Sequence, residues 1–204
     1  CYPYYREYHN QDLYCLTIRQ GIQTTIEVDL PAIVPSLTGS SVRKIRKLLA
    51  LFAETVPVIP DMKQLKQALG AGDERTLKNY LHLLEEAGIL QAVYKKGSGL
   101  NGLGKPEKLY LHNPNIMQAL SFSQRPDIGT LRESYFISMV AVHHTVETAT
   151  YGDFIVDGKV TVEIGGRNKT FKQIAGLKNS YLVLDGLESG AGNRIPLWLF
   201  GFLY

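Results

Sequence analysis

The sequence predicts a multi-domain α+β protein, and three observations lead to this fold class. Helical and strand patterns between residues 41 and 112 follow the order of a winged helix-turn-helix. After Asn113-Pro114-Asn115, a helix and short strands surround an Asp-Gly turn. The 204 residues are 45% hydrophobic and 20% charged, which excludes a wholly disordered chain. We therefore expect a helical segment at 1–34, a winged helix-turn-helix at 35–113 and an α/β domain with a mixed sheet at 114–204.

Composition and charge exclude several classes of protein. The longest apolar run, Ile195 to Tyr204, has ten residues and is interrupted by a proline and a glycine, so no membrane span is expected. Two cysteines are too few for a disulfide framework, and no signal peptide is recognisable, which predicts a cytoplasmic protein. The net charge of +3 comes entirely from residues 1–115, while residues 116–204 are neutral. An anionic partner would therefore bind the first part.

The first two helical regions follow from apolar periodicity and proline positions. Residues 3–28 predict one or two tyrosine-rich helices that end at Asp29-Leu30-Pro31, because the residue before a proline avoids the helical conformation. A linker then precedes a helix at about 41–55. The apolar stripe of this helix consists of Val42, Ile45, Leu48, Leu49 and Phe52.

The remaining elements of the winged helix are bounded by turn and capping signals. Helices are expected at 62–69 and 73–87, separated by Gly70-Ala71-Gly72, with Asp73 as N-cap and Gly88 at the C-terminal end. Strands are expected at 89–96 and 107–112, with a glycine-rich loop between them.

Basic and polar residues of this region form the candidate DNA interface. In a helix-turn-helix, the outer face of the second helix reads bases, while cations contact phosphates. Double-stranded DNA is thus the expected partner. The candidate residues are Arg43, Lys44, Arg46, Lys47, Arg75, Lys78, Asn79, His82, Lys95 and Lys96. The alternative is a protein-interaction module without nucleic acid, which Glu85, Glu86 and the neutral second part favour.

The glycine-rich loop is expected to be a wing rather than a nucleotide site. Gly97-x-Gly99-x-x-Gly102 matches the dinucleotide pattern, and Gly99-x4-Gly104-Lys105 nearly matches a P-loop. However, Pro106 stands where a P-loop needs Ser or Thr for magnesium, and a strand rather than a helix follows. We therefore expect no ATP site in this chain.

The second part is expected to alternate helices and strands. Helices are predicted at 116–122, 131–142 and 169–177, and strands at 151–156, 159–164, 181–185 and 196–203.

The hairpin around Asp157-Gly158 is predicted to place two carboxylates together. Four apolar residues share one face only if the loop has an odd number of residues, which favours a three-residue loop. These residues are Phe154, Val156, Val160 and Val162. This register places Asp153 and Glu163 on one face, with Cβ atoms about 5–8 Å apart. Such a pair can share Mg²⁺ or Mn²⁺, and a metal held there can activate water for phosphodiester hydrolysis.

Three further residues are candidates for the same site. Glu133 could be a third carboxylate, although Thr130-x-x-Glu133 is also a capping box that would direct Glu133 to a backbone amide. Lys169 and Gln173 would share a face of the expected helix at 169–177, which Asn168 could cap. A polar strand face and an ordinary solvated helix remain the alternative interpretation of these residues.

Several stretches of the sequence resemble a known family. They are LPAIVPS at 30–36, RTLKNYLHLLEEAGIL at 75–90, KPEKLYLHNPNIMQAL at 105–120, GTLRESYF at 129–136, GDFIVDGK at 152–159, VEIGGRNKTFKQI at 162–174 and IPLWLFGFLY at 195–204. They resemble the C-terminal region of prokaryotic predicted AAA-superfamily ATPases. That region, of unknown function, carries a winged helix and a PD-(D/E)xK nuclease-like domain. The resemblance implies that an ATP-binding module lies upstream, absent from this chain, and that residues 1–34 end its helical lid.

The resemblance also implies roles for the site residues. Glu133, Asp153 and Glu163 would match the acidic residues of the nuclease superfamily, with the metal on the latter two. The superfamily usually has a lysine two residues after the glutamate, where this chain has Gly165, so Lys169 would take its place.

In the superfamily this lysine orients the attacking water or stabilises the pentavalent phosphate, and Gln173 would match an accessory glutamine. The implied function is DNA binding with a Mg²⁺- or Mn²⁺-dependent endonuclease domain. If Lys169 does not reach the carboxylates, the domain would instead be an inactive scaffold.

Overall fold

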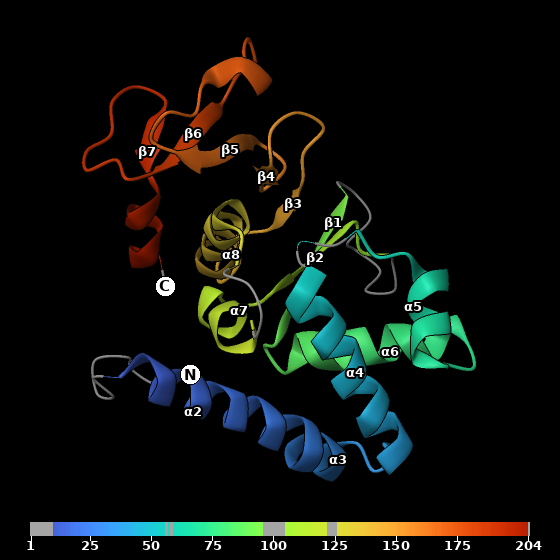
Figure 1. Cartoon of the computed structure of the whole chain (residues 1–204). Coiled ribbons are helices and arrows are strands. Elements are labelled where there is room, and N and C mark those ends of the chain that lie inside the picture. Colours follow the sequence, from blue (N-terminus) through green and yellow to red (C-terminus); the bar gives the residue numbers. More distant parts are fainter. Residues whose placement is uncertain (1–9, 56, 58, 96–104, 122–125, 204) are drawn as a thin grey trace. The chain divides into compact units, whose positions relative to one another are not determined.

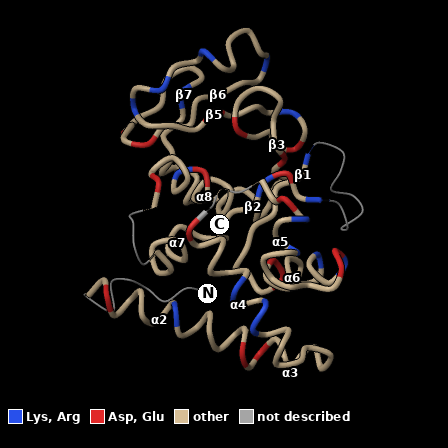
Figure 2. The backbone as a smooth tube through the Cα atoms, turned by 45° about the vertical axis from the view of Figure 1, so that its right-hand side comes forward, with Lys and Arg blue, Asp and Glu red and all other residues tan. Residues whose placement is uncertain are grey.

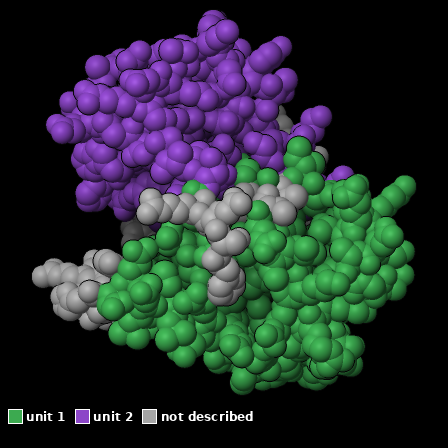
Figure 3. Space-filling model, viewed as in Figure 1, with its two compact units in different colours: residues 1–91, 109–126 green, residues 92–108, 127–204 purple. Residues whose placement is uncertain are grey.

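The computed structural model describes residues 10–55, 57, 59–95, 105–121 and 126–203 (Figure 1). The chain divides into two compact units, coloured in Figure 3. The first unit comprises Cys1–Gln91 with Leu109–Pro126, and the second comprises Ala92–Lys108 with Asp127–Tyr204. The fold class is α+β, as predicted, with seven α-helices and a mixed seven-stranded sheet among the described residues.

Helices build most of the first unit. They are α2 (Gln11–Thr24), a π-helical turn (Thr25–Asp29), α3 (Leu30–Ile33), α4 (Gly39–Thr55), α5 (Met62–Leu69), α6 (Glu74–Glu86) and α7 (Pro114–Leu120). Strands β1 (Leu90–Lys95) and β2 (Lys108–Leu111) follow α6. Ile45, Leu48, Leu77 and Leu84 are fully buried, so the apolar faces of α4 and α6 form the core.

Capping explains where α5 and α6 begin and end. Asp61 caps α5 by accepting from the backbone N–H groups of Lys63 and Gln64, and Asp73 caps α6 by accepting from Thr76 at 2.6 Å. Gly70 and Gly88 follow the two helices with positive φ, a conformation that favours glycine. The predicted bounds of both helices are therefore confirmed to within one residue.

The second unit includes most of β1, from Ala92 onward, together with one helix and five further strands. They are α8 (Ile128–Val140), β3 (Val146–Thr148), β4 (Phe154–Val156), β5 (Val160–Gly166), β6 (Ser180–Asp185) and β7 (Arg194–Pro196). Single 3₁₀ helices occupy Phe171–Gln173 and Leu197–Phe202. Helix α8 packs on β5 and on the last 3₁₀ helix (Figure 1). Phe136 and Phe154 are fully buried between them and stack at 6.0 Å.

The sheet has the strand order β2-β1-β3-β4-β5-β6-β7. β3, β4 and β5 pair antiparallel, whereas β5, β6 and β7 pair parallel. β3 is missing from the sequence prediction. Its parallel partner is β1, through Tyr94 and Lys95, and that pairing is distant in sequence.

The prediction that the first helical segment ends at Asp29-Leu30-Pro31 is wrong. Pro31 lies in the first turn of α3, where its missing N–H is not required. The π-helical turn before it lets the Leu30 N–H donate to the Thr25 carbonyl, so the chain remains helical through Ile33.

Two predictions for the second unit are also wrong. The helix expected at 169–177 is only the 3₁₀ turn Phe171–Gln173, because Ile174 turns into the core and Gly176 then adopts φ +79. The strand expected at 196–203 ends at Pro196. The following residues instead form a 3₁₀ helix on α8, where the Tyr135 hydroxyl approaches Gly201 so closely that a Cβ there would lie 2.5 Å away.

Candidate functional site

The β4–β5 hairpin has the register predicted from its apolar residues. Phe154 pairs with Val162, and Val156 pairs with Val160, so the loop contains three residues. The Asp153 N–H extends this ladder by donating to the Val162 carbonyl at 2.9 Å. If the ladder continued by one position, Asp153 would lie beside Glu163, so the observed register agrees with the predicted carboxylate pair, which itself stays a prediction.

Asp153 is held at the start of β4 by backbone contacts. Its Oδ2 accepts from the Ile164 N–H at 2.6 Å. The preceding Gly152 has φ +83, and a Cβ there would lie 2.9 Å from both the Val162 carbonyl oxygen and Ile174 Cγ2. Only glycine fits this approach, which packs the segment before β4 against Ile174.

Glu163 is a fully buried carboxylate with two side-chain partners. Its side chain is 0% exposed, and Oε1 pairs with Lys169 Nζ at 2.5 Å. With its amide nitrogen turned towards Glu163, Gln173 donates to Oε2 at 2.7 Å. Burial raises the pKa of Glu163, with a further increase from the Asp153 charge, while the hydrogen bond from Lys169 opposes both.

Lys169 interacts electrostatically with the acidic residues of the site. The hydrogen bond to Glu163 raises the pKa of Lys169, and the charges of Asp153 and Glu133 raise it further. Of the three predicted carboxylates, Glu163 forms the ion pair with this ammonium group. The turn after β5 places Lys169, whose N–H donates to the Gly166 carbonyl at 2.9 Å.

Gly165 makes room for Lys169. A Cβ at this position would lie 2.7 Å from both Cβ and Cγ of Lys169, because the lysine side chain crosses the Gly165 backbone. The residue two positions after Glu163 therefore cannot carry a side chain while Lys169 makes its ion pair. The helix predicted to bring Lys169 and Gln173 together is absent, yet both residues contact Glu163.

The capping box that competed for Glu133 is not formed. Asp127 is the N-cap of α8, and its Oδ1 accepts from the Thr130 N–H at 2.9 Å and the Thr130 hydroxyl at 3.2 Å. Glu133 lies in the second turn of the helix, beyond the capping position. Asn168 likewise caps no helix, since Thr170 precedes the 3₁₀ turn.

The donor set suits a hard divalent cation. Asp153 and Glu163 supply carboxylate oxygens, which Mg²⁺ and Mn²⁺ prefer. Within the part of the chain that the structure describes, no three His, Cys, Asp or Glu side chains surround one metal position. Two carboxylates match the way Mg²⁺ is bound, because this ion usually keeps several waters and takes substrate phosphate oxygens as its other ligands.

The predicted DNA-binding residues lie mainly on exposed faces. Arg43, Arg46 and Lys47 are exposed on α4, and Lys44 is half-buried. Three residues of α6 are also exposed, namely Arg75, Asn79 and His82, whereas Lys78 is half-buried. Lys95 is exposed at the end of β1, and Lys96 lies outside the described residues.

Three of these cations have partners within the first unit. Arg46 pairs with Glu27 at 2.7 Å, and Lys78 pairs with Glu74 at 3.5 Å. Lys47 donates to the Ala68 carbonyl at 2.5 Å. Figure 2 shows basic residues along α4, and both acidic and basic residues along α2 and α6. The positive charge of the sequence is therefore partly neutralised within the fold.

A family model for a domain of unknown function, DUF8612, matches residues 2–127. The chain belongs to this family. No curated protein and no solved structure matches the chain. The DUF8612 match ends where the continuous segment of the second unit begins, at Asp127. The carboxylates and Lys169 thus lie outside the matched residues.

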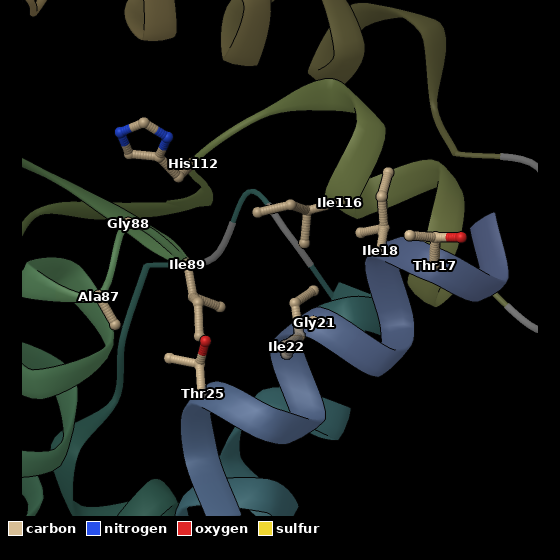
Figure 4. Close-up of a pocket in the computed structure, with 10 residues that line it drawn as sticks. All are labelled: Thr17, Ile18, Gly21, Ile22, Thr25, Ala87, Gly88, Ile89, His112 and Ile116. Atoms are coloured by element: carbon tan, nitrogen blue, oxygen red, sulfur yellow. The ribbon is translucent and has the colours of Figure 1, made fainter. Parts of the chain in front are cut away.

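The DUF8612 region contains a hollow that the sequence did not indicate. It has a volume of about 330 Å³ and lies between α2 and the Ala87–Ile89 turn, with Ile18, Ile22 and Ile116 on its walls (Figure 4). His112 is the titratable residue of its lining, and burial lowers the pKa of this imidazole. The His112 Nδ1 has no hydrogen-bond partner among the described residues. Within the described part of the chain, His112 has no second titratable side chain beside it in the lining of this pocket, so the pocket lacks an acid–base pair.

Among the described residues, no helix combines the length and the apolar character needed to cross a membrane.

Proposed function

We propose that the second unit is a PD-(D/E)xK nuclease-like domain that hydrolyses DNA phosphodiester bonds with Mg²⁺ or Mn²⁺. The ion pair between Lys169 and the buried Glu163 is the observation that carries this proposal. Lys169 reaches the carboxylates although Gly165 stands at the usual lysine position, and Gly165 supplies the space for it. This arrangement favours the active alternative over the inactive scaffold.

Each side chain would have a separate task. Asp153 and Glu163 would hold the cation, which supplies Lewis acidity and a bound water of lowered pKa. The Ile164 N–H orients Asp153, and Gln173 orients Glu163. Lys169 would place its ammonium group beside the phosphate and stabilise the charge that develops on it.

We further propose that α4, α5, α6, β1 and β2 form a winged helix that holds the DNA. Their order supports this reading, and Arg75, Asn79 and His82 occupy the exposed face of α6. By the resemblance, the chain would act as the C-terminal part of an AAA-type ATPase. The alternative, a protein-interaction module without nucleic acid, is favoured by the internal partners of Arg46, Lys47 and Lys78.

Cleavage of supercoiled plasmid DNA with Mn²⁺ tests the nuclease proposal. We expect the wild-type chain to nick the plasmid, and the Glu163→Gln variant to lose at least about 100-fold in rate, because a metal ligand is removed. Glu188→Gln changes an exposed glutamate of the same unit and should retain the wild-type rate. Equal rates for the two variants would contradict the proposed site.

Binding of a DNA duplex across a salt series distinguishes DNA binding from the alternative. We expect affinity to fall steeply with salt, and Arg75→Ala to reduce the slope of log K against log salt by about 0.9. Arg46→Ala should reduce it less, because Arg46 pairs with Glu27. Absence of binding at low salt would favour the protein-interaction module.

A further inference from the structure

An open groove leads away from the carboxylates within the second unit. The segment before β4 forms one side with Tyr151 and Asp153, and the 3₁₀ turn and following residues form the other with Lys172, Gln173 and Leu177. Its volume is about 780 Å³. Asp153 and Gln173 belong both to this groove and to the candidate site, so a molecule in the groove would adjoin the reacting phosphate.

The groove presents apolar surface to solvent. Tyr151 is 63% exposed and Leu177 is 37% exposed. Both side chains line the same groove as Asp153, so a ligand bound there would cover them. The Tyr151 ring stands two residues before Asp153 and can stack on a flat ligand in the groove.

The walls of the groove are held in place by packing below them. Gly152 lies directly after Tyr151, and its Cα approaches Ile174, which is 1% exposed and packs on Leu182 and Leu184. This contact joins the two sides of the groove. Tyr151 and Lys172 are therefore presented from anchored segments rather than from a loose loop.

The cationic Lys172 and the exposed apolar side chains of the groove are suited to a nucleotide whose base is unpaired. Lys172 is exposed and cationic, and can contact a phosphate. A base within a duplex is already stacked on its neighbours, so only an unpaired base can cover Tyr151 and Leu177. Base stacking on an aromatic side chain depends little on sequence, because every base has a π-face.

We propose that this groove binds an unpaired nucleotide next to the scissile phosphate, with its base on Tyr151 and its phosphate on Lys172. The substrate class is then DNA with a single-stranded end or flap rather than intact duplex. This inference rests on the proposed nuclease function and specifies the substrate of that site.

Binding of two DNA probes, with Ca²⁺ in place of Mg²⁺ or Mn²⁺, tests the inference. One probe is a duplex with a single-stranded overhang that carries 2-aminopurine, and the other is the blunt duplex of the same sequence. We expect the 204-residue chain to bind the overhang more tightly and to quench its fluorescence. Tyr151→Ala should weaken overhang binding by about 5- to 150-fold, which corresponds to the loss of one stacked base, and leave blunt-duplex binding unchanged.

Matched variants separate stacking from other roles of these residues. Tyr151→Phe should bind the overhang like the wild-type chain, because stacking needs the ring and not the hydroxyl. Phe202→Ala removes another exposed aromatic ring of the same unit and should have no effect. Lys172→Ala should lower the salt slope for the overhang by about 0.7, whereas Lys159→Ala should not change it.

The outcomes distinguish this inference from the function on which it rests. If Tyr151→Ala binds the overhang as tightly as wild type, or if both probes bind equally, the groove proposal is overturned. Loss of Mn²⁺-dependent cleavage in Glu163→Gln would then still support the nuclease. If the chain neither binds nor cleaves any DNA, both proposals fail.

Discussion

The two units differ in one ion pair, because the second unit pairs a lysine with a completely buried carboxylate. In the first unit, Lys78 pairs with Glu74 at 3.5 Å on a helix surface, where water screens the charges and such a pair contributes about 0–1 kcal/mol. In the second unit, Glu163 is completely buried and pairs with Lys169 at 2.5 Å. Burying a carboxylate carries a desolvation penalty of several kcal/mol, about as large as the attraction it gains. The buried pair is thus the costlier arrangement, and the stronger indication of a function.

The largest expected difference in stability comes from removing the lysine of each ion pair. Lys169→Met should lower the free energy of unfolding by about 3 kcal/mol, because it leaves the Glu163 carboxylate buried without its counter-charge. Lys78→Met should lower it by less than about 1 kcal/mol. Urea unfolding of both variants measures the difference. Adding Glu163→Gln to Lys169→Met should restore part of the loss, and similar losses for the two single variants would refute the contrast.

Two glycines offer the next test. Gly165→Ala should lower the free energy of unfolding by about 1–3 kcal/mol and also reduce DNA cleavage, because the added Cβ displaces the Lys169 side chain. Gly72→Ala in the first unit has no atom within 4 Å of the added Cβ and should leave the stability nearly unchanged. Thermal unfolding compares the two. A Gly165→Ala protein with wild-type stability and activity would show that Lys169 needs no such space.

The N-cap aspartates of the two units should affect stability in the same way, because both caps are exposed. The difference between the units is therefore confined to the buried ion pair. The hydrogen bond from the Thr130 N–H lowers the pKa of Asp127, so its stabilisation is complete above the unfolded value of about 3.9 and is lost as the pH falls through the lower folded value. Asp127→Ala should cost about 1 kcal/mol at neutral pH. Asp127→Asn should retain the cap and lose this pH dependence.

The equivalent residue of the first unit provides the control for that experiment. The Thr76 N–H lowers the pKa of Asp73 in the same way, so Asp73→Asn should remove a pH dependence of the same sign. Unfolding at neutral and strongly acidic pH measures both variants. Opposite signs at the two caps would show that the units differ in more than their buried charges.

The sequence predicted local features well and distant ones poorly. The caps at Asp73 and Gly88 and the hairpin register at Phe154 and Val162 depend on neighbouring residues, and the structure confirms them. β3 is absent from the prediction because one of its two partner strands, β1, is distant in sequence.

The candidate site was predicted for a reason that is partly wrong. Lys169 and Gln173 were expected to share a face of a helix that the structure lacks. They meet because both side chains reach the same buried carboxylate, and the burial of Glu163 cannot be read from its neighbours in sequence. The sequence does not indicate Tyr151, because the exposure of a lone tyrosine depends on the fold.

The crossing of Lys169 over Gly165 has a consequence for how this domain can evolve. The two positions cannot vary independently, since a side chain at 165 and a long one at 169 would occupy the same volume. Related sequences should therefore fall into two groups, one with glycine at 165 and lysine at 169, and one with lysine at 165 and a small residue at 169. Passage between the groups would have to go through an intermediate without the ammonium group, so each lineage should retain the arrangement that it inherited.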